Sequence, residues 1–256
     1  MSVKARSGAG ERTGGGAGEH ADRAKRPDEA TISIIIPTLD EARVIAALLA
    51  QLEPLRDGCE IVFVDGGSCD GTREAILDAG HWLIDAPRGR GPQLNAGARA
   101  SSGQILFFLH ADSTLPPDPL GEIRRAMRGH RVGCFGVRFE PSSPLMLCCR
   151  FLSNFRCYVR RIMFGDQGIF IDRDLFFEVG GFPDLPLMED YRFSLDLRAR
   201  GFRPAATRRR IATSSRRYGT TPVSRVKTMI LMGRLRRMYR EGASVDEIAR
   251  IYGQAR

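Results

Sequence analysis

The chain has 256 residues, of which 43% are hydrophobic, so it is long and apolar enough to bury a sizeable core. No apolar run approaches the ~18 residues needed to cross a bilayer, which excludes a membrane-spanning protein and leaves a soluble or surface-attached one. The net charge of +9 is uneven, because residues 198–256 carry 16 Lys and Arg against 3 Asp and Glu. Such a segment favours an anionic lipid, a polyphosphate or a nucleic acid as partner, although a solvated arginine face gives the same pattern.

The first thirty residues differ in composition from the rest. Residues 1–30 are rich in Gly, Ala, Arg and Glu and cannot bury enough surface to offset the entropy of ordering, so we expect disorder. They lack the apolar core of a secretory leader, and the six cysteines of the chain show no Cys-x-x-Cys spacing. We therefore expect reduced thiols in a cytoplasmic protein.

The next residues have the pattern of strands that alternate with helices. Ile32–Ile36 is an apolar run closed by Pro37, which is typical of a strand buried on both faces. Thr38 and Glu41 have the spacing of a capping box, and apolar residues follow at helical spacing, which predicts that a helix begins there. Further strands are predicted at 61–64, 82–84 and 105–109. Strands joined by helical crossovers indicate a parallel sheet.

The second half continues the mixture of strands and helices. Asp118 followed by Pro119 is typical of an N-cap and a first helical residue. Strands are predicted at 133–140 and 169–171, and helices at 145–162 and from the pair Glu189 and Asp190 to Arg200. We expect an α/β fold with a mostly parallel central sheet flanked by helices, with one domain over residues 31–221 and a basic helical tail over residues 222–256.

Asp65 comes directly after the second predicted strand. The following Gly66 and Gly67 let the backbone approach a ligand closely, and Ser68 can form hydrogen bonds. A carboxylate at this point can accept hydrogen bonds from a nucleobase imide or from ribose hydroxyls, but an ordinary Asp-Gly turn explains the pattern equally well. The glycine patterns of dinucleotide-binding proteins and of P-loop ATPases are both absent.

Two arginines lie on a glycine-bearing loop just before the helix predicted at 93–100. Arg88 and Arg90 can hold a phosphate-bearing ligand through their guanidinium groups, close to the positive end of the helix. Solvated arginines account for the loop equally well.

His110 and Asp112 follow the most apolar strand, at the edge where ligands bind in open α/β sheets. The two residues are two positions apart, so they point the same way if the strand continues, and both can then reach one cation. The carboxylate suits Mg²⁺ or Mn²⁺, and the imidazole favours Mn²⁺. A strand that simply ends in a polar turn is the alternative.

Five short motifs occur along roughly residues 31–221, at residues 35–41, 64–72, 109–113, 180–184 and 188–190. In order and spacing they resemble the motifs of the family 2 glycosyltransferases. The resemblance implies the type A glycosyltransferase fold with its Rossmann-like nucleotide-binding half, a nucleotide-diphosphate-sugar donor and usually a divalent metal.

The resemblance also assigns roles to single residues. It implies that Asp65 contacts the base, that His110 and Asp112 occupy the family's metal site, and that Asp190 is the general base of an inverting transfer. His110 departs from the family, because many relatives have Asp there, and the identity of the metal is therefore open. The other donor contacts that we expect are Pro37, Thr38, Glu41, Gly67, Ser68, Arg88, Arg90, Asn95 and Ala111.

Within the family, the chain looks most like a bacterial subgroup that is named for its association with radical-SAM genes and arsenosugar biosynthesis. The motifs behind this likeness are at residues 87–90, 93–97, 110–112, 164–168 and 186–190.

The residues themselves give Asp190 two interpretations. Adjacent carboxylates at a helix start are stabilised by the helix dipole, so Glu189 and Asp190 are explained by capping alone. Opposite a donor site, however, Asp190 can take the proton from an acceptor hydroxyl, a step typically worth ~10²- to 10⁴-fold in rate. Glu189 then positions the acceptor. Asp166 and Gln167, on a glycine-flanked turn, are further candidate acceptor contacts.

The tail contains a basic amphipathic helix. Leu231, Leu235 and Met238 form an apolar stripe with arginines outside it, which is compatible both with an anionic membrane and with docking on the body of the protein.

We therefore expect an inverting glycosyltransferase that moves a sugar from a UDP- or GDP-linked donor to a hydroxyl acceptor with Mn²⁺ or Mg²⁺. The acceptor is a small metabolite, a lipid or a glycan. The protein is expected in the cytoplasm, with a peripheral position at the inner face of the membrane left open. A nucleotidyltransferase is the main rival, whereas nucleic-acid binding is disfavoured because no aromatic-interleaved basic surface is evident.

Overall fold

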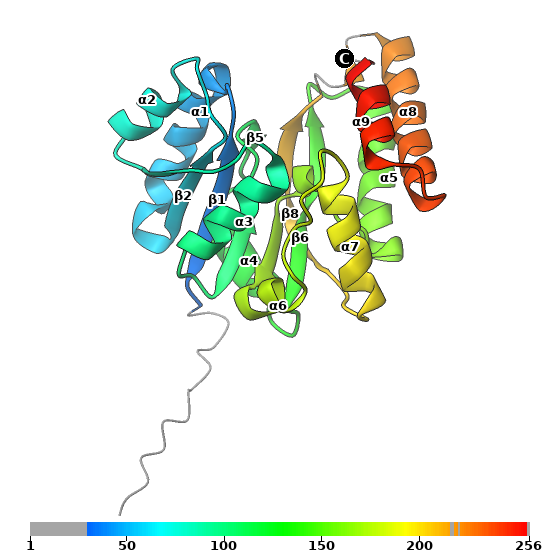
Figure 1. Cartoon of the computed structure of the whole chain (residues 1–256). Coiled ribbons are helices and arrows are strands. Elements are labelled where there is room, and N and C mark those ends of the chain that lie inside the picture. The colour runs from blue at the N-terminus through cyan, green and yellow to red at the C-terminus, as the bar shows by residue number, and fades with distance from the viewer. Residues whose placement is uncertain (1–29, 216–217, 220, 255–256) are drawn as a thin grey trace, which may run out of the picture.

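The computed structural model describes residues 30–215, 218–219 and 221–254. The segment predicted to be disordered therefore lies outside the described residues, except for Ala30. Within this part of the chain, one eight-stranded sheet has the order β3-β2-β1-β4-β7-β6-β8-β5, and helices cover both of its faces (Figure 1). The strands are β1 (Ile32–Thr38), β2 (Glu60–Asp65), β3 (Trp82–Asp85), β4 (Ile105–Phe108), β5 (Ser113–Thr114), β6 (Val132–Glu140), β7 (Ile169–Asp172) and β8 (Ala205–Ser214).

The α-helices that surround the sheet match most of the predicted segments. Asp118 is the N-cap of α4, and its side chain accepts a hydrogen bond from the backbone N–H of Gly121, as its position before Pro119 predicts. The helices are α1 (Ala42–Leu52), α2 (Thr72–Asp78), α3 (Arg90–Ala100), α4 (Pro119–Ala126), α5 (Pro144–Arg160), α6 (Arg173–Glu178), α7 (Glu189–Ala199), α8 (Pro222–Arg240) and α9 (Val245–Gln254). Two short 3₁₀ helices are η1 (Glu53–Gly58) and η2 (Gly165–Gln167).

The sheet is mixed, so the prediction of a mostly parallel sheet holds only for its first half. Strands β3, β2, β1 and β4 are parallel neighbours. Strand β7 is antiparallel to both β4 and β6, β5 is antiparallel to β8, and β6 and β8 are parallel. The apolar runs of β4 and β7 look alike in the sequence, because a strand buried on both faces has the same pattern in either direction.

Alternate side chains of β1 face two separate cores. Ile34 and Ile36 pack with α1 and α4 on one face, whereas Ile35 packs on the other face with side chains of α3, α6 and α7. The continuous apolar run is therefore explained by burial on both sides. Strand β8 was not predicted, since Arg208, Arg209 and Arg210 interrupt its apolar residues and remain exposed.

Helix α3 lies very close to the sheet at Gly97. A Cβ atom at this position would overlap the Cγ2 atom of Ile35 and lie 2.9 Å from Cγ2 of Val64. We expect Gly97→Ala to lower the free energy of unfolding by about 1–3 kcal/mol, as overpacking of a core does. Urea denaturation measures the change.

Gly233 provides the matched control, because it also lies inside a helix and a Cβ atom there would meet nothing within 4 Å. Gly233→Ala is expected to raise the free energy of unfolding by about 0.5–1 kcal/mol through helix propensity. Equal effects of the two substitutions would contradict the close approach at Gly97.

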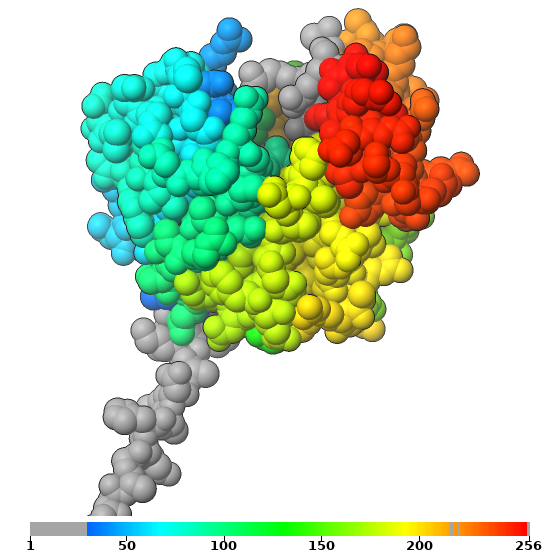
Figure 2. Space-filling view, viewed as in Figure 1, coloured from blue at the N-terminus to red at the C-terminus, as the bar shows by residue number. Residues whose placement is uncertain are grey.

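The C-terminal helices pack on the body of the protein. Leu235 of α8 and Ile248 of α9 are fully buried in a cluster with Tyr191 of α7 and Ile162. Figure 2 shows α9, in red, lying directly against the yellow surface of α7. The apolar stripe of the predicted tail is therefore used for docking. None of the described helices is both long enough and apolar enough to span a bilayer.

Candidate active site

A large polar cavity lies where the chain leaves β1 and β4. Its volume is about 670 Å³, and its walls include seven residues that the sequence marked as candidates. These residues are Pro37, Glu41, Arg90, His110, Ala111, Asp112 and Asp166. Residues that are far apart in the sequence and were assigned to donor, metal and acceptor therefore share one space.

The carboxylate of Asp65 is fully buried at the end of β2 and is used by its own loop. It accepts hydrogen bonds from the backbone N–H groups of Gly67 and Ser68, both at 2.9 Å, and from Arg73 at 2.9 Å. Thr38 also donates its hydroxyl to this carboxylate at 3.3 Å. Asp65 shapes the loop and is not among the residues that line the cavity.

The predicted capping box of Thr38 and Glu41 is wrong. Thr38 is the last residue of β1, and α1 begins at Ala42 without a capping side chain of its own N-cap residue. The loop after β2 supplies the partners, because Asp70 accepts a hydrogen bond from the Ala42 N–H at 2.9 Å and Thr72 accepts one from the Glu41 N–H at 2.8 Å. The loop after β1 and the loop after β2, each part of a family-like motif, are thus joined by hydrogen bonds.

We expect Asp65→Asn to destabilise the fold in a pH-dependent way. Burial raises the pKa of the Asp65 carboxyl, but hydrogen bonds from Ser68, Arg73 and Gly67 outweigh it and hold the pKa below its usual value. The ionised group therefore stabilises the fold above its unfolded pKa of about 3.9, and this contribution is lost as the pH falls toward the folded pKa.

At neutral pH the substitution is expected to cost about 1–3 kcal/mol of unfolding free energy, because it disrupts a buried hydrogen-bonded network. Urea titrations at neutral and acidic pH should show that the loss of stability in acid is smaller in the variant than in the parent. The exposed Asp78 on α2 gives the control, Asp78→Asn, and an equal effect of both changes would refute the assignment.

His110 and Asp112 lie in a turn rather than in the extended strand that the sequence suggested. Strand β4 ends at Phe108, and the Ser113 N–H donates to the His110 carbonyl oxygen at 3.1 Å. Both side chains nevertheless line the same cavity.

The donor atoms of this turn fit a cation that also binds phosphates. Among the described residues, no three His, Cys, Asp or Glu side chains gather closely enough to hold a metal ion by themselves. Mg²⁺ sites that act on phosphates commonly use one or two protein carboxylates and take the remaining ligands from the phosphates and water. An imidazole and a carboxylate beside an open cavity fit such an ion, and the imidazole favours Mn²⁺.

Gly165, at the start of η2, joins the His110 turn to α7. Its backbone N–H donates to the Oδ2 atom of Asp190 at 2.8 Å. A Cβ atom at Gly165 would lie 2.5 Å from the Nε2 atom of His110 and 3.5 Å from the same Asp190 oxygen. The three residues therefore meet at one point, and Asp190 lies next to the cavity although it is not one of its lining residues.

Gly165→Ala is expected to displace the His110 ring and to lower turnover by about 10- to 100-fold, because a misplacement near 1 Å at a reacting centre has effects of this size. Steady-state kinetics of sugar transfer measures the change, and circular dichroism verifies the fold. The control is Gly253→Ala on α9, since a Cβ atom at Gly253 would have open space around it and its backbone φ is not positive. Unchanged turnover in Gly165→Ala would contradict the convergence of these groups.

Arg90 and Glu189 form an ion pair at the edge of the cavity. Arg90 is the first residue of α3. Its Nη1 atom lies 3.2 Å from Oε1 of Glu189, and the Glu189 carboxylate is almost fully buried. Burial and the neighbouring Asp190 raise the pKa of Glu189, while Arg90 opposes the rise. Burial lowers the pKa of Arg90, but Glu189 and Asp190 outweigh it and raise that pKa.

Other candidate residues lie outside the cavity walls. Asn95 forms two hydrogen bonds with the backbone of Phe182, at 2.7 and 2.9 Å, and so fixes the loop after α6. Gln167 is buried and accepts a hydrogen bond from the Phe164 N–H at 3.1 Å. The remaining candidates that do not line the cavity are Gly67, Ser68 and Arg88, which are solvent-accessible, and Thr38, which is buried.

The second half of the chain supplies a wall that sequence reasoning missed. Phe139 of β6, Thr213 and Ser214 of β8, and Ser224 and Thr228 of α8 line the same cavity. No local motif marks these residues, since only the packing of α8 beside β6 and β8 brings them to the site.

Two arginines, one on α5 and one on α8, lie over one aromatic ring. The guanidinium carbon of Arg156 lies 4.1 Å from the centre of the Phe164 ring, and that of Arg236 lies 5.8 Å from it. Burial lowers the pKa of Arg156 although Asp166 and Asp190 act in the opposite direction. Burial also lowers the pKa of Arg236, to about 10, and Arg156 adds to this effect. Concentrated positive charge of this kind favours a neighbouring anion.

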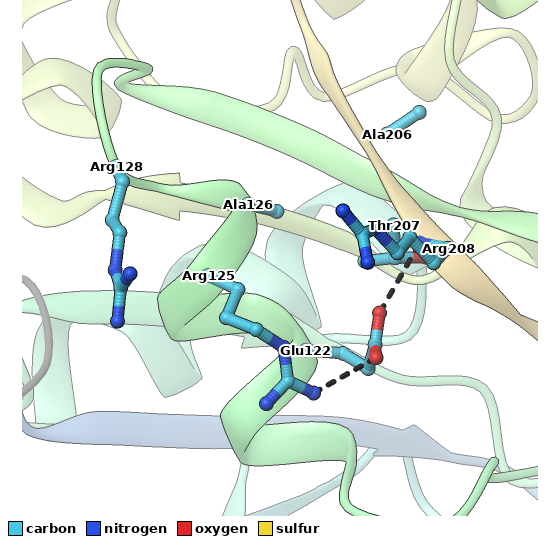
Figure 3. Close-up of a pocket in the computed structure, with 7 residues that line it drawn as sticks. All are labelled: Glu122, Arg125, Ala126, Arg128, Ala206, Thr207 and Arg208. Carbon is cyan, nitrogen blue, oxygen red and sulfur yellow. Dashed lines mark hydrogen bonds and ion pairs between the residues drawn. The ribbon is translucent and has the colours of Figure 1, made fainter.

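A smaller cavity of about 290 Å³ lies between α4 and β8 (Figure 3). Its buried Glu122 is bonded to Arg125 at 2.8 Å and accepts from the Arg208 N–H at 3.1 Å. Burial raises the pKa of Glu122, but these hydrogen bonds outweigh it and lower the pKa. The carboxylate fastens α4 to β8, and the large cavity remains the candidate active site.

The geometry and the sequence define the class of the protein. The family model described as glycosyl transferase family 2 matches residues 33–182, and the chain belongs to this family. The matched range ends before α7 and α8, so it covers the β1, β2 and β4 loops of the cavity but not Asp190 or the α8 wall.

Known proteins similar to this chain include glycosyltransferases. An uncharacterized glycosyltransferase from Nostoc sp. is 34% identical over 100 residues, which are 36% of this chain and 31% of the relative. The alignment thus spans about a third of that relative. Glucosyl-3-phosphoglycerate synthase from Mycobacterium tuberculosis, solved with Mn²⁺, UDP and glucosyl-3-phosphoglycerate, has a TM-score of 0.55 at 19% identity, covering 84% of this chain and 81% of that chain.

A second solved structure is similar over a larger share of the chain. A mannosyltransferase from Pyrobaculum calidifontis in complex with GDP-Man and Mn²⁺ has a TM-score of 0.59 at 19% identity and covers 88% of this chain and 68% of that chain. These likenesses identify the fold as that of the type A glycosyltransferases, with a mixed central sheet.

Proposed function

We propose that this protein is an inverting glycosyltransferase that moves a sugar from a UDP- or GDP-linked donor to a hydroxyl group of an acceptor. The observation that carries the proposal is the shared cavity, in which Pro37, Glu41, Arg90, His110 and Asp112 face one space beside Asp190. Membership of glycosyl transferase family 2 supports the same reaction. The M. tuberculosis and P. calidifontis proteins hold UDP or GDP-Man together with Mn²⁺.

The donor lies, in this proposal, across the loops after β1, β2 and β4. Pro37 and Glu41 contact the nucleoside. The loop after β2, which is held by its hydrogen bonds to Asp65, supplies a rigid surface beside them. Arg90 faces the diphosphate, because its side chain lines the cavity. The ion pair with Glu189 holds the guanidinium group in this position. This differs from the expected role of Glu189 as an acceptor contact, since its carboxylate is buried against Arg90.

His110 and Asp112 are the residues that would hold a Mn²⁺ or Mg²⁺ ion. Such an ion neutralises negative charge on the departing diphosphate. The turn that contains both residues is closed by its own hydrogen bond, which keeps the two side chains at the edge of the cavity.

Asp190 acts as the general base. Its Oδ2 atom is oriented by the Gly165 N–H, and the carboxylate accepts the proton of the acceptor hydroxyl as the oxygen attacks the anomeric carbon. The new carbon–oxygen bond forms while the bond between the anomeric carbon and the diphosphate breaks, so the product has the inverted configuration.

We also propose that the acceptor carries an anionic group. The support comes from Arg156 and Arg236, whose half-buried guanidinium groups both lie over the Phe164 ring and form no ion pair within the part of the chain that the structure describes. Of the two, Arg156 is close enough to Asp166 and Asp190 for their charges to act on it. An acceptor screen that compares anionic with neutral hydroxyl compounds tests this, and preference for neutral acceptors would refute it.

Fewer observations support our proposals for the subgroup within the family and for the location in the cell. The likeness to the radical-SAM and arsenosugar subgroup rests on short motifs, and transfer to an arsenic-containing acceptor in the same screen would support it. A cytoplasmic location is supported by the six free cysteines. A fluorescent fusion found outside the cytoplasm would contradict that location.

The function is tested by ligand-induced stabilisation followed by product analysis. Nucleotide-sugars are screened for Mn²⁺-dependent increases in melting temperature, since a ligand of the native state stabilises it by mass action. With the donor identified, we expect release of a nucleoside diphosphate. Release of pyrophosphate would favour a nucleotidyltransferase, and stabilisation by none of the nucleotide-sugars would refute the proposal.

A further inference from the structure

Helix α5 exposes an unusually apolar face. Within its 17 residues, six large apolar or aromatic side chains are exposed, and Phe151 retains 68% of its accessible surface. Phe151 and Phe155 stack on each other with ring centres 6.1 Å apart. The exposed residues are Leu147, Phe151, Leu152, Phe155, Tyr158 and Val159.

The neighbouring helix α8 also exposes apolar side chains. It packs beside α5, as Figure 1 shows at the right of the molecule, and the two helices are in contact. Val223, Val226 and Ile230, on the first half of α8, are also exposed. We refer to these three residues and the six of α5 as the α5/α8 face.

The α5/α8 face is separate from the surfaces that hold these helices in place. Met146 and Cys149 of α5 are buried against Val137 and Phe139 of β6. Asn154 forms two hydrogen bonds with the backbone of Val137, at 2.9 and 3.2 Å. Both helices are therefore docked by other residues, and the apolar face remains exposed.

The charge of these helices is of one sign. Neither α5 nor α8 contains Asp or Glu, whereas Arg160, Lys227 and Arg234 are exposed cations on them. An exposed apolar patch of this kind marks a protein or membrane interaction site. Basic residues around it complement anionic lipid headgroups, whereas a symmetric dimer through the same face would bring two sets of cations together.

We propose that the α5/α8 face binds the surface of an anionic membrane. The aromatic and aliphatic side chains enter the region between headgroups and acyl chains, and the surrounding Arg and Lys side chains contact the headgroups. Ser224 and Thr228 of α8 line the candidate active site, so membrane binding holds this cavity close to the lipid surface. The inference stands on exposure and charge and is independent of the proposed reaction.

Vesicle cosedimentation of the full chain tests the apolar part of the face. The probes are vesicles of phosphatidylcholine alone and of phosphatidylcholine with phosphatidylglycerol, and we expect binding to the anionic vesicles. The triple variant Phe151→Ser, Phe155→Ser and Ile230→Ser removes side chains that are at least 47% exposed, so the fold should persist. Each change is expected to weaken the partition about tenfold. The matched control is Leu77→Ser with Trp82→Ser, exposed apolar residues of α2 and β3.

Charge is tested in a second pair of variants. Lys227→Gln with Arg234→Gln is expected to weaken binding about fivefold for each charge, and added salt should have a similar effect. Arg43→Gln with Arg99→Gln, which changes exposed cations on α1 and α3, should leave binding unchanged. Equal binding by the parent and the triple variant, or by anionic and neutral vesicles, would overturn the proposal.

Sedimentation velocity completes the test. A dimer of the parent chain that dissociates in the triple variant, without vesicle binding by the parent, would assign the face to a second copy and refute the membrane proposal. The Mn²⁺-dependent stabilisation by nucleotide-sugars is measured on the same variants. We expect it to be unchanged in all of them, so a failure of membrane binding remains distinguishable from a failure of the proposed reaction.

Discussion

Asp112→Asn is expected to lower sugar transfer by about a thousandfold, which corresponds to several kcal/mol of charge stabilisation in the transition state. The substitution keeps the size of the side chain but removes the negative charge that a divalent cation requires. Asp112 is half-buried in the wall of the cavity and belongs to no ion pair or core cluster among the described residues, so the fold should be unaffected.

Two measurements separate a loss of metal binding from other defects. Stabilisation by the nucleotide-sugar should lose its dependence on Mn²⁺ in Asp112→Asn, while the melting temperature without ligand stays near that of the parent. Asp174→Asn, which changes an exposed carboxylate on α6, is the control and should behave as the parent. Retained Mn²⁺ dependence in Asp112→Asn would remove this residue from the proposed metal site.

Asp190→Asn is expected to lower kcat by about 10²- to 10⁴-fold, the usual contribution of a positioned general base. The amide oxygen of Asn can still accept the hydrogen bond from the Gly165 N–H, which is 2.8 Å from the carboxylate in the parent. The local structure should therefore persist while the capacity to accept a proton is lost. Single-turnover kinetics with saturating donor measures the chemical step.

The two substitutions should differ in their effect on donor binding. Mn²⁺-dependent stabilisation by the donor is expected to survive in Asp190→Asn and to be lost in Asp112→Asn. Asp196→Asn offers a control on the same helix, since it removes only the surface ion pair with Arg192. Near-parental turnover of Asp190→Asn would refute its role as the base.

Local sequence patterns were sufficient to predict most of the strands and helices. The run Ile32–Ile36 predicted a strand buried on both faces, and β1 indeed packs against helices on both sides. Asp118 with Pro119 predicted the start of α4, because a cap depends on residues within one turn of it. Strand β8 was missed, since the exposed Arg208–Arg210 obscure a strand that is fixed by its pairing with β6 and β5.

In the candidate site, too, local patterns identify some residues, whereas others depend on contacts between distant segments. His110 and Asp112 could be singled out as candidates because polar side chains that follow an apolar strand are visible in the sequence, and the structure places both at one cavity. The capping box at Thr38 was wrong because the true partners of the α1 start, Asp70 and Thr72, lie about thirty residues away. Long-range partners of this kind leave no trace in the local spacing.

The sequence by itself determined where apolar strands end and which chemical groups follow them, because burial and capping are governed by neighbouring residues. Only the tertiary structure decided which of these groups share a cavity. In the folded chain, the Asp65 carboxylate accepts hydrogen bonds from its own loop. Asp190 and His110 both lie next to Gly165, and α8 forms part of the wall of the cavity. Strand order, strand direction and helix docking are set by contacts between distant segments, and no spacing within one segment encodes them.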